Sequence, residues 1–417
     1  MSIQSSSTAP RLEEFSDQLK SERYAAPIQR RYLWVAQRFH DYLERKCIAI
    51  EAVGPAELED FLRWELRSWR KRYGRDPSNA VEWRRRHKTA INGFLRLVHG
   101  HWPVVAAPTT ATEAFHRDLV QGYDAWMQNL LGLASATRSK RTTQALEFLT
   151  ELGRRGDQVS LAQLGVGDID AYVQKRGKGR RRQTIEDYTV CLRSFLRYLH
   201  SSGRTALNLS NTVLGPRIYD NEQIPTALRP EEVQAVLEVT RQDCSPIGRR
   251  DYAFLMLLAA YGLRAGEVVA LRLEDIDWKK EILHVRHSKT GAESELPLVR
   301  EAGEAVLSYL EKARPVSKHR ELFLQVRAPY RAYKHGSILN CVISARLKMA
   351  GIIPKGRKGP HAFRHARAVS MLHAAVPLKV IGDVLGHRSE KSTAVYLKLA
   401  TEELRTVGLN IPEEVLP

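Results

Sequence analysis

Hydrophobic residues recur at spacings of three and four along most of the chain, which is the period of an amphipathic α-helix. The segments Ile28–Leu43 and Glu231–Val239 are clear examples. One region differs, because Ile282–His287 and Glu295–Leu298 have the composition of two short strands on either side of a turn at Ser288–Ser294. The pattern predicts a mainly α protein with one small antiparallel β-sheet.

The first half of the chain contains a weak internal repeat of about one hundred residues. The segment PAELEDFLRW at 55–64 resembles VGDIDAYVQK at 166–175, and FLRLVHG at 94–100 resembles FLRYLHS at 195–201. The repeat indicates two small helical bundles in tandem. The alternative is that any two small amphipathic bundles resemble one another to this degree.

Two stretches rich in proline, glycine and asparagine, at His101–Thr112 and Leu207–Ala227, have the composition of linkers. After the second one, proline and two acids at 230–232 mark the start of a helix. We therefore predict an amino-terminal helical domain at 1–106, a second helical domain at 110–206, a linker at 207–226 and a carboxy-terminal domain at 227–417.

The composition limits the compartment and the partner. The chain has 65 Lys and Arg against 47 Asp and Glu, a net charge of +18, which favours nucleic acid or an anionic membrane surface as partner. The longest apolar run, Tyr252–Leu263, is too short for a membrane span of about 18–20 residues. The four cysteines form no CxxC pair, and the first residues lack a signal-like segment, so we expect a cytoplasmic protein with reduced thiols.

The distribution of basic residues favours nucleic acid. Ten basic residues lie between Arg63 and Lys88, and a second cluster, KRGKGRRR, occupies Lys175–Arg182. Both clusters lie within predicted helical domains and not in detached tails. The residues expected to contact DNA are Arg70, Lys71, Arg84, Arg85, Lys178, Arg180, Arg181 and Arg182.

Candidate catalytic residues concentrate in the carboxy-terminal domain. An apolar helix is followed at once by Arg264, a position from which a guanidinium can reach into a cleft. Lys289 lies at the predicted turn between the two strands. A helix that begins at Pro360 places His361 and Arg364 one turn apart on one face.

Two further candidates follow along the chain. A helix predicted to stop at a glycine presents His387 just beyond its end, and Tyr396 lies in the middle of a predicted helix at Glu390–Ala400. Taken alone, each of these residues has an ordinary explanation as a surface, capping or core residue. His361 and His365 have the spacing of a zinc pair, but no Glu follows the first histidine and an arginine lies between them, so we disfavour a metal.

Together these residues resemble the tyrosine recombinase (phage integrase) family over Thr226–Pro412. The motifs that carry the resemblance are GLRAGE at 262–267, SKTG at 288–291, HAFRH at 361–365 and LGH at 385–387, nine residues before Tyr396. The matching positions are Arg264 and Arg364 for the two catalytic arginines, Lys289 for the hairpin lysine, His361 for the histidine of the third motif, His387 for a position that is His or Trp in relatives, Tyr396 for the nucleophile and Glu267 for a supporting acid.

The resemblance also implies a fold and a domain plan. It implies a helical SAM-like core-binding bundle, for which 112–204 fits best, and a mainly α catalytic domain with a small antiparallel sheet and a carboxy-terminal tail. The additional unit at 13–100 is then either a second such bundle or an arm-site DNA-binding domain.

The implied function is site-specific recombination through a 3′-phosphotyrosyl intermediate, with integration or excision of a mobile element as the expected role. The implied partners are double-stranded DNA with specific sites, a homotetramer on two duplexes and, where needed, accessory recombinases; no cofactor and no membrane are expected. Two alternatives stay open at this point: a non-catalytic DNA-binding or regulatory protein, and a type IB topoisomerase that relaxes DNA.

Overall fold

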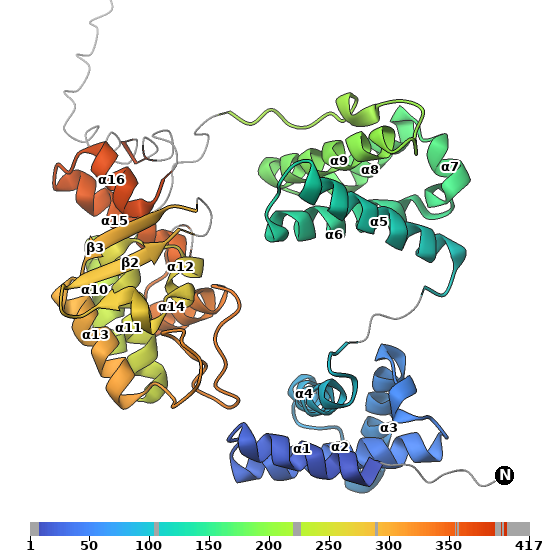
Figure 1. Ribbon diagram of the computed structural model, residues 1–417, viewed down its shortest axis with the longest axis horizontal. Coiled ribbons are helices and arrows are strands. Elements are labelled where there is room, and N and C mark those ends of the chain that lie inside the picture. Colours follow the sequence, from blue (N-terminus) through green and yellow to red (C-terminus); the bar gives the residue numbers. More distant parts are fainter. Residues whose placement is uncertain are drawn as a thin grey trace, which may run out of the picture. The chain divides into compact units, whose positions relative to one another are not determined.

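The computed structural model describes residues 8–103, 108–219, 227–287, 291–354, 356, 358–387, 393 and 396–397. Within these ranges the chain is mainly helical, with one small sheet, as the sequence predicts (Figure 1). The chain divides into two compact units, one at 104–222 and one that combines 1–103 with 223–417. Among the described residues, none of the helices has the length and apolar character needed to span a bilayer.

The first four α-helices form a bundle around their own aromatic core. Phe39, Phe61 and Phe94 are fully buried in it. Local signals fix the ends of these helices: the Asn79 side chain accepts from the N–H of Glu82 at the start of α4. The elements are α1 (Thr8–Ser21), α2 (Ala26–Arg45), the 3₁₀ helix η1 (Ile50–Ala52), α3 (Pro55–Tyr73) and α4 (Ala80–His99).

Residues 108–219 form a second bundle with a core that includes Tyr123, Phe148 and Phe195. The paired segments of the internal repeat occupy corresponding places, since they begin α3 and α8 and end α4 and α9. The elements are α5 (Ala111–Asn129), α6 (Ser135–Leu152), η2 (Gly153–Gly156), α7 (Gln158–Ala162), α8 (Val166–Gly177), α9 (Arg182–Ser201) and η3 (Leu209–Asn211).

The carboxy-terminal helices surround α11, whose side chains are buried along nearly its whole length. The helices are α10 (Pro230–Arg241), α11 (Pro246–Tyr261), α12 (Ala265–Ala270), η4 (Leu273–Asp275), α13 (Arg300–Lys312), α14 (Ile338–Met349), α15 (Pro360–His373) and α16 (Leu378–Leu385). The predicted helix starts at Pro230 and Pro360 are both confirmed.

The sheet contains both predicted strands and one that the pattern did not show. Strand β2 (Ile282–Arg286) pairs antiparallel with β3 (Glu293–Pro297), with Leu283 opposite Leu296. Strand β3 begins and β2 ends slightly earlier than predicted. The additional strand β1 (Ile276–Asp277) pairs antiparallel with β2 and has only two residues, too few to display an alternating pattern.

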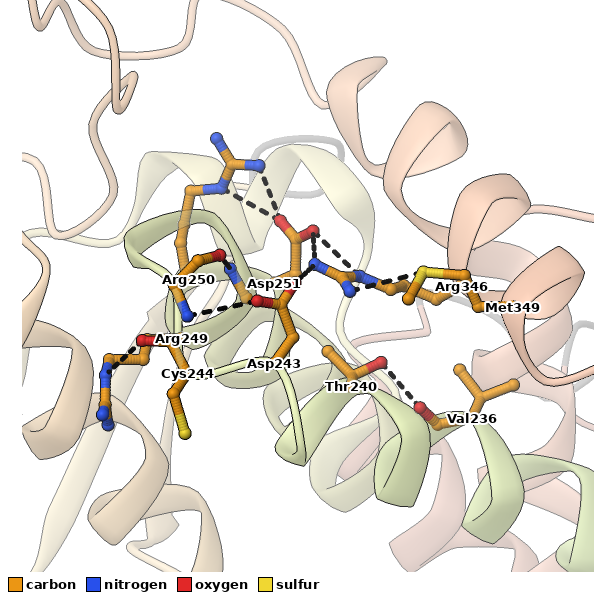
Figure 2. Close-up of polar contacts among 11 residues, drawn as sticks. Val236, Thr240, Asp243, Cys244, Arg249, Arg250, Asp251, Arg346 and Met349 are labelled. Carbon is orange, nitrogen blue, oxygen red and sulfur yellow. Dashed lines mark hydrogen bonds and ion pairs between the residues drawn. The ribbon is translucent and has the colours of Figure 1, made fainter.

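A buried ion network joins α11 to α14 and includes Asp243, which lies between α10 and α11 (Figure 2). The Asp251 carboxylate accepts from Arg250 Nη2 at 2.6 Å on one oxygen and from Arg346 Nη2 at 2.8 Å on the other. Arg346 also pairs with Asp243 at 2.8 Å. Because Arg250, Asp251 and Arg346 are each less than one-tenth exposed, every charge depends on its partners for solvation. The network fixes the framework that carries α15.

Candidate active site

Backbone carbonyls at the ends of two helices hold the two predicted catalytic arginines. Arg364 on α15 is buried and donates from Nη1 to the Gly262 carbonyl at 2.8 Å and from Nη2 to the Leu385 carbonyl at 2.5 Å. Arg264 donates from Nη2 to the Gly386 carbonyl at 3.1 Å. The carboxy-terminal ends of α11 and α16 carry partial negative charge, so they attract and orient both guanidinium groups. Burial lowers the pKa of Arg364 to about 10, which leaves it charged at neutral pH.

Glycines are required where these two helices end. Gly262 and Gly386 both have positive φ, at 65° and 62°. A Cβ on Gly386 would lie 2.5 Å from the His287 ring, and one on Gly262 would lie 2.7 Å from Leu385. The glycines therefore end the helices and allow the carbonyls to approach the arginines.

Glu267 connects Arg264 to the sheet. Its carboxylate accepts from the backbone N–H of Arg264 at 2.7 Å and from Arg264 Nη1 at 2.7 Å. His287 Nδ1 lies 3.0 Å from the same carboxylate, and its Nε2 lies 3.0 Å from Ser294 Oγ. Burial alone would raise the pKa of Glu267, but the hydrogen bonds from His287 and Arg264 outweigh burial and hold that pKa below its ordinary value.

Tyr396 lies in the same site as the arginines. It is only 3% exposed and is hydrogen-bonded to Arg364. It lies in a turn in which its N–H donates to the Thr393 carbonyl, while the neighbouring residues of its predicted helix are mostly outside the described part of the chain. Burial raises the pKa of Tyr396, and the nearby Arg364 and Arg264 only partly offset this, so the phenol is protonated at neutral pH.

Two histidine rings flank the phenol. The His387 ring stacks on Tyr396 with ring centroids 6.2 Å apart, and His387 Nδ1 lies 2.8 Å from Thr393 Oγ1. Burial and the two arginines lower the pKa of His387 to about 4, so this ring is neutral at physiological pH. His365 Nδ1 lies 3.2 Å from the Tyr396 hydroxyl.

The structure thus brings Arg264, Glu267, Arg364, His387 and Tyr396 together. The other two predicted residues differ. His361 is exposed in the first turn of α15, with its ring 6.2 Å from that of His365. Lys289 lies outside the described residues. On either side of it, the His287 N–H donates to the Ala292 carbonyl and the Gly291 N–H donates to the His287 carbonyl, each at 2.8 Å.

Two residues of the site, His287 and His365, were not predicted. His365 directly follows Arg364, but its spacing from His361 suggested only a metal pair, which was disfavoured. His287 ends a predicted strand and showed no signal of its own. The described residues hold no group of three or more His, Cys, Asp or Glu side chains that could bind a metal ion.

The predicted DNA-contacting residues differ in their surroundings. Arg70, Arg84 and Arg85 pair with Asp76, Glu59 and Glu82. Lys71 lines an open hollow on the amino-terminal bundle. The second cluster, at 178–182, is exposed between α8 and α9, and Arg182 donates to the Arg217 carbonyl.

Sequence comparisons identify the family. Residues 226–403 match the model of the phage integrase family. A putative integrase/recombinase, y4gC of Sinorhizobium fredii (strain NBRC 101917 / NGR234), is 52% identical over 45% of this chain and 97% of its own length. The tyrosine recombinase XerC of Pelotomaculum thermopropionicum (strain DSM 13744 / JCM 10971 / SI) is 32% identical over 72% of this chain and 91% of its own length.

Solved structures share the fold. A XerH site-specific recombinase bound to a palindromic difH substrate in a post-cleavage complex aligns with a TM-score of 0.54 and 15% identity, over 77% of this chain and 88% of that one. A lambda integrase tetramer bound to a Holliday junction aligns with a TM-score of 0.52 and 17% identity, over 77% of this chain and 87% of that one.

The site and the relatives together define a class of protein, a DNA strand-breaking and rejoining enzyme that uses a tyrosine. The chain belongs to the tyrosine recombinase (phage integrase) family and is a site-specific recombinase. Family membership decides against the topoisomerase and the non-catalytic regulator as the main function.

Proposed function

We propose that this recombinase cuts and rejoins double-stranded DNA through Tyr396, which becomes joined to a 3′ phosphate. The observation that carries the proposal is the shared site of Tyr396, Arg264 and Arg364. Paired guanidinium groups bind the non-bridging oxygens of a phosphodiester and neutralise the charge that develops on five-coordinate phosphorus. Glu267 positions Arg264 through its two hydrogen bonds to that residue. This chemistry needs no cofactor.

The remaining roles concern protons. Lys289, which lies between β2 and β3 in the sequence, protonates the departing 5′ oxygen. His361 and His387 place hydrogen bonds around the phosphate, and the neutral state of His387 suits an uncharged donor or acceptor. The ester conserves the energy of the broken bond, so a second 5′-hydroxyl rejoins the strand without ATP.

The biological role that we propose is integration or excision of a mobile element in the cytoplasm, by four protomers on two duplexes carrying specific sites. The integrase/recombinase names of the relatives and the tetrameric lambda integrase assembly support this role. Accessory recombinases are proposed partners where one chain does not suffice. Eight exposed basic residues hold the DNA backbone, namely Arg70, Lys71, Arg84, Arg85, Lys178, Arg180, Arg181 and Arg182.

A nicked suicide duplex that carries the recombination site tests the chemistry, because loss of the short strand traps the covalent adduct. Wild-type protein and a Tyr252→Phe control should form a protein–DNA adduct, whereas Tyr396→Phe should form none. An adduct that persists in Tyr396→Phe, or its absence with wild-type protein, contradicts the proposal. Joined products from two-site plasmids, as opposed to relaxation of plasmids without a site, separate recombination from topoisomerase activity.

A further inference from the structure

Helices α2 and α3 contribute to an open hollow of about 540 Å³ on the amino-terminal bundle. Its lining contains five cations, one serine and one tryptophan, and it contains no carboxylate. The lining residues are Arg38, Arg45, Trp64, Arg67, Ser68, Lys71 and Arg72. We call this surface the Trp64 hollow.

Most cations of the Trp64 hollow have no neutralising partner. Arg38 donates to the buried Glu65 at 2.7 Å, and its guanidinium lies 4.8 Å from the Trp64 ring centroid. Among the residues that the structure describes, Arg45, Arg67, Lys71 and Arg72 pair with no carboxylate, and we call these the four hollow cations.

Several other basic residues of α3 and α4 have carboxylate partners. Arg63 pairs with Asp60, Arg86 pairs with Glu82 at 2.6 Å, and Lys88 contacts Glu59 at 2.9 Å. The four hollow cations differ from these paired residues, and they lie around one tryptophan.

Helix stability does not account for this arrangement. Cations in the last turn of a helix are favourable, which covers Arg45 on α2 and both Lys71 and Arg72 on α3. Arg67, however, lies before that last turn and is four residues from Lys71, and like charges at this spacing destabilise a helix. A ligand that carries several negative charges offsets this repulsion.

We propose that the Trp64 hollow binds the phosphate backbone of duplex DNA and is the main electrostatic contact of the amino-terminal bundle. Regularly spaced phosphates supply several negative charges at once, and the partly exposed indole offers an apolar surface for a sugar. The inference rests on the proposed function only in taking DNA as the partner.

The test compares two full-length triple variants that remove the same charge. The first, Arg67→Gln with Lys71→Gln and Arg72→Gln, removes hollow cations. The control, Arg63→Gln with Arg86→Gln and Lys88→Gln, removes exposed cations that have carboxylate partners. Dissociation constants for a fluorescent duplex are measured over a range of salt concentrations, and circular dichroism checks the fold.

We expect the salt dependence, the slope of log Kd against log salt, to become shallower by about 2.7 in the hollow variant, at about 0.9 per lost phosphate contact. The control should change by less than about 1. Equal slopes in the two variants would overturn the inference. Loss of binding to phosphatidylserine vesicles with an unchanged DNA slope would overturn it in favour of a lipid surface. Adduct formation by wild-type protein is measured separately, so a failure of the proposed function stays distinguishable.

A second and independent observation concerns the nucleophile. The Tyr396 hydroxyl is buried, and the nitrogen atom His365 Nδ1 lies 3.2 Å from it. The ring centroids are 5.5 Å apart, and α15 holds the ring in place beside Arg364. A protonated phenol attacks phosphorus poorly, so a base within hydrogen-bonding reach has a direct chemical use.

We infer that His365 is a catalytic base for Tyr396, which deepens the proposed function and depends on Tyr396 being the nucleophile. The phenol proton moves to Nδ1 as the phenolic oxygen bonds to phosphorus. The bond from phosphorus to the 5′ oxygen breaks, and that oxygen takes a proton from Lys289, the donor assigned in the proposed function. In rejoining, a 5′-hydroxyl gives its proton to Lys289 and attacks phosphorus. The bond from phosphorus to the tyrosyl oxygen breaks, and His365 returns the proton to the phenol.

Single-turnover adduct formation on the suicide duplex tests this role. His365→Gln, which keeps a polar side chain, should slow the reaction by about 10²–10⁴-fold. Added imidazole should restore part of the rate in His365→Ala. A duplex with sulfur in place of the 5′ bridging oxygen, which needs no leaving-group proton, should not rescue either variant.

The control is His373→Gln, which changes an exposed histidine at the end of the same helix and should keep the wild-type rate. Wild-type rates in His365→Gln would overturn the role as base, and so would rescue by the sulfur substrate, which would place His365 on the leaving-group side. Failure of wild-type protein to form an adduct contradicts the proposed function itself.

Discussion

Replacement of Glu267 by Gln removes the carboxylate that connects Arg264 to the sheet. The carboxylate accepts three hydrogen bonds, two from Arg264 and one at 3.0 Å from His287. Glutamine has one acceptor oxygen, and its NH₂ group must face a donor of Arg264 or His287. Charge-assisted hydrogen bonds contribute about 1.5–3 kcal/mol each, and an unpaired buried donor costs about 1–3 kcal/mol. We expect the free energy of unfolding to fall by about 3 kcal/mol.

The same change should reduce activity, because Arg264 keeps its charge but loses the contact that fixes its position. Removal of a preorganised donor costs about 10²–10³-fold in rate, so a displaced donor should cost about 10–100-fold. Urea unfolding and single-turnover adduct formation measure the two effects. The control is Glu274→Gln, a 40% exposed acid whose ion pairs with Arg272 and Arg320 should contribute less than about 1 kcal/mol. Wild-type stability and rate in Glu267→Gln would refute this role.

Three further predictions concern the framework and the pH response. Asp251→Asn should lower the free energy of unfolding by about 3–5 kcal/mol, because it leaves two buried arginines without their shared counter-charge. Asp243→Asn, which changes a 28% exposed carboxylate, should lower it by less than about 1 kcal/mol. Equal losses for the two variants in urea titrations would contradict the larger role of Asp251. Gly386→Ala should lower the free energy of unfolding by about 1–2 kcal/mol because of the left-handed backbone, and by more because the new Cβ would lie 2.5 Å from the buried His287 ring. Gly351→Ala, with open space around its Cβ, should show only the backbone effect. Equal unfolding midpoints for the two variants would exclude the clash. Folding lowers the pKa of His387 from its ordinary value of 6.5 to about 4, so the unfolded chain binds a proton first as the pH falls. The free energy of unfolding should therefore drop between pH 6.5 and about pH 4. His387→Gln should flatten that drop, and an unchanged pH profile of urea unfolding would show that another group causes it.

Acid stability also follows from Glu267, whose pKa is lowered in the folded state. A carboxylate of this kind stabilises the fold above its ordinary pKa of 4.5, and that contribution is lost as the pH falls through the lower folded-state value. Wild-type protein should therefore lose stability below about pH 4.5 more steeply than Glu267→Gln. Parallel pH profiles of the free energy of unfolding for the two proteins would mean that the hydrogen-bonding partners of Glu267 do not stabilise its carboxylate.

The sequence alone determined the helical class, two of the three strands and the order of the candidate residues. These features have local signals: a proline begins α15, a glycine ends α16, and alternating residues form β2. Local signals of this kind act within a few residues, so hydrophobic periodicity and capping residues suffice to predict them. The motifs around Arg264 and Tyr396 are likewise short stretches of sequence that can be identified without knowledge of the fold.

Only the tertiary structure decided what these residues contact. Arg364 donates to the carbonyl of Gly262, 102 positions earlier in the chain, and His365 meets Tyr396, 31 positions later. The basic cluster at 63–88 shows the same limit, because its residues look alike in sequence while the fold gives a carboxylate to some and not to others. Such partners are set by helix packing over long sequence separations, and no local pattern encodes which side chains the packing brings together.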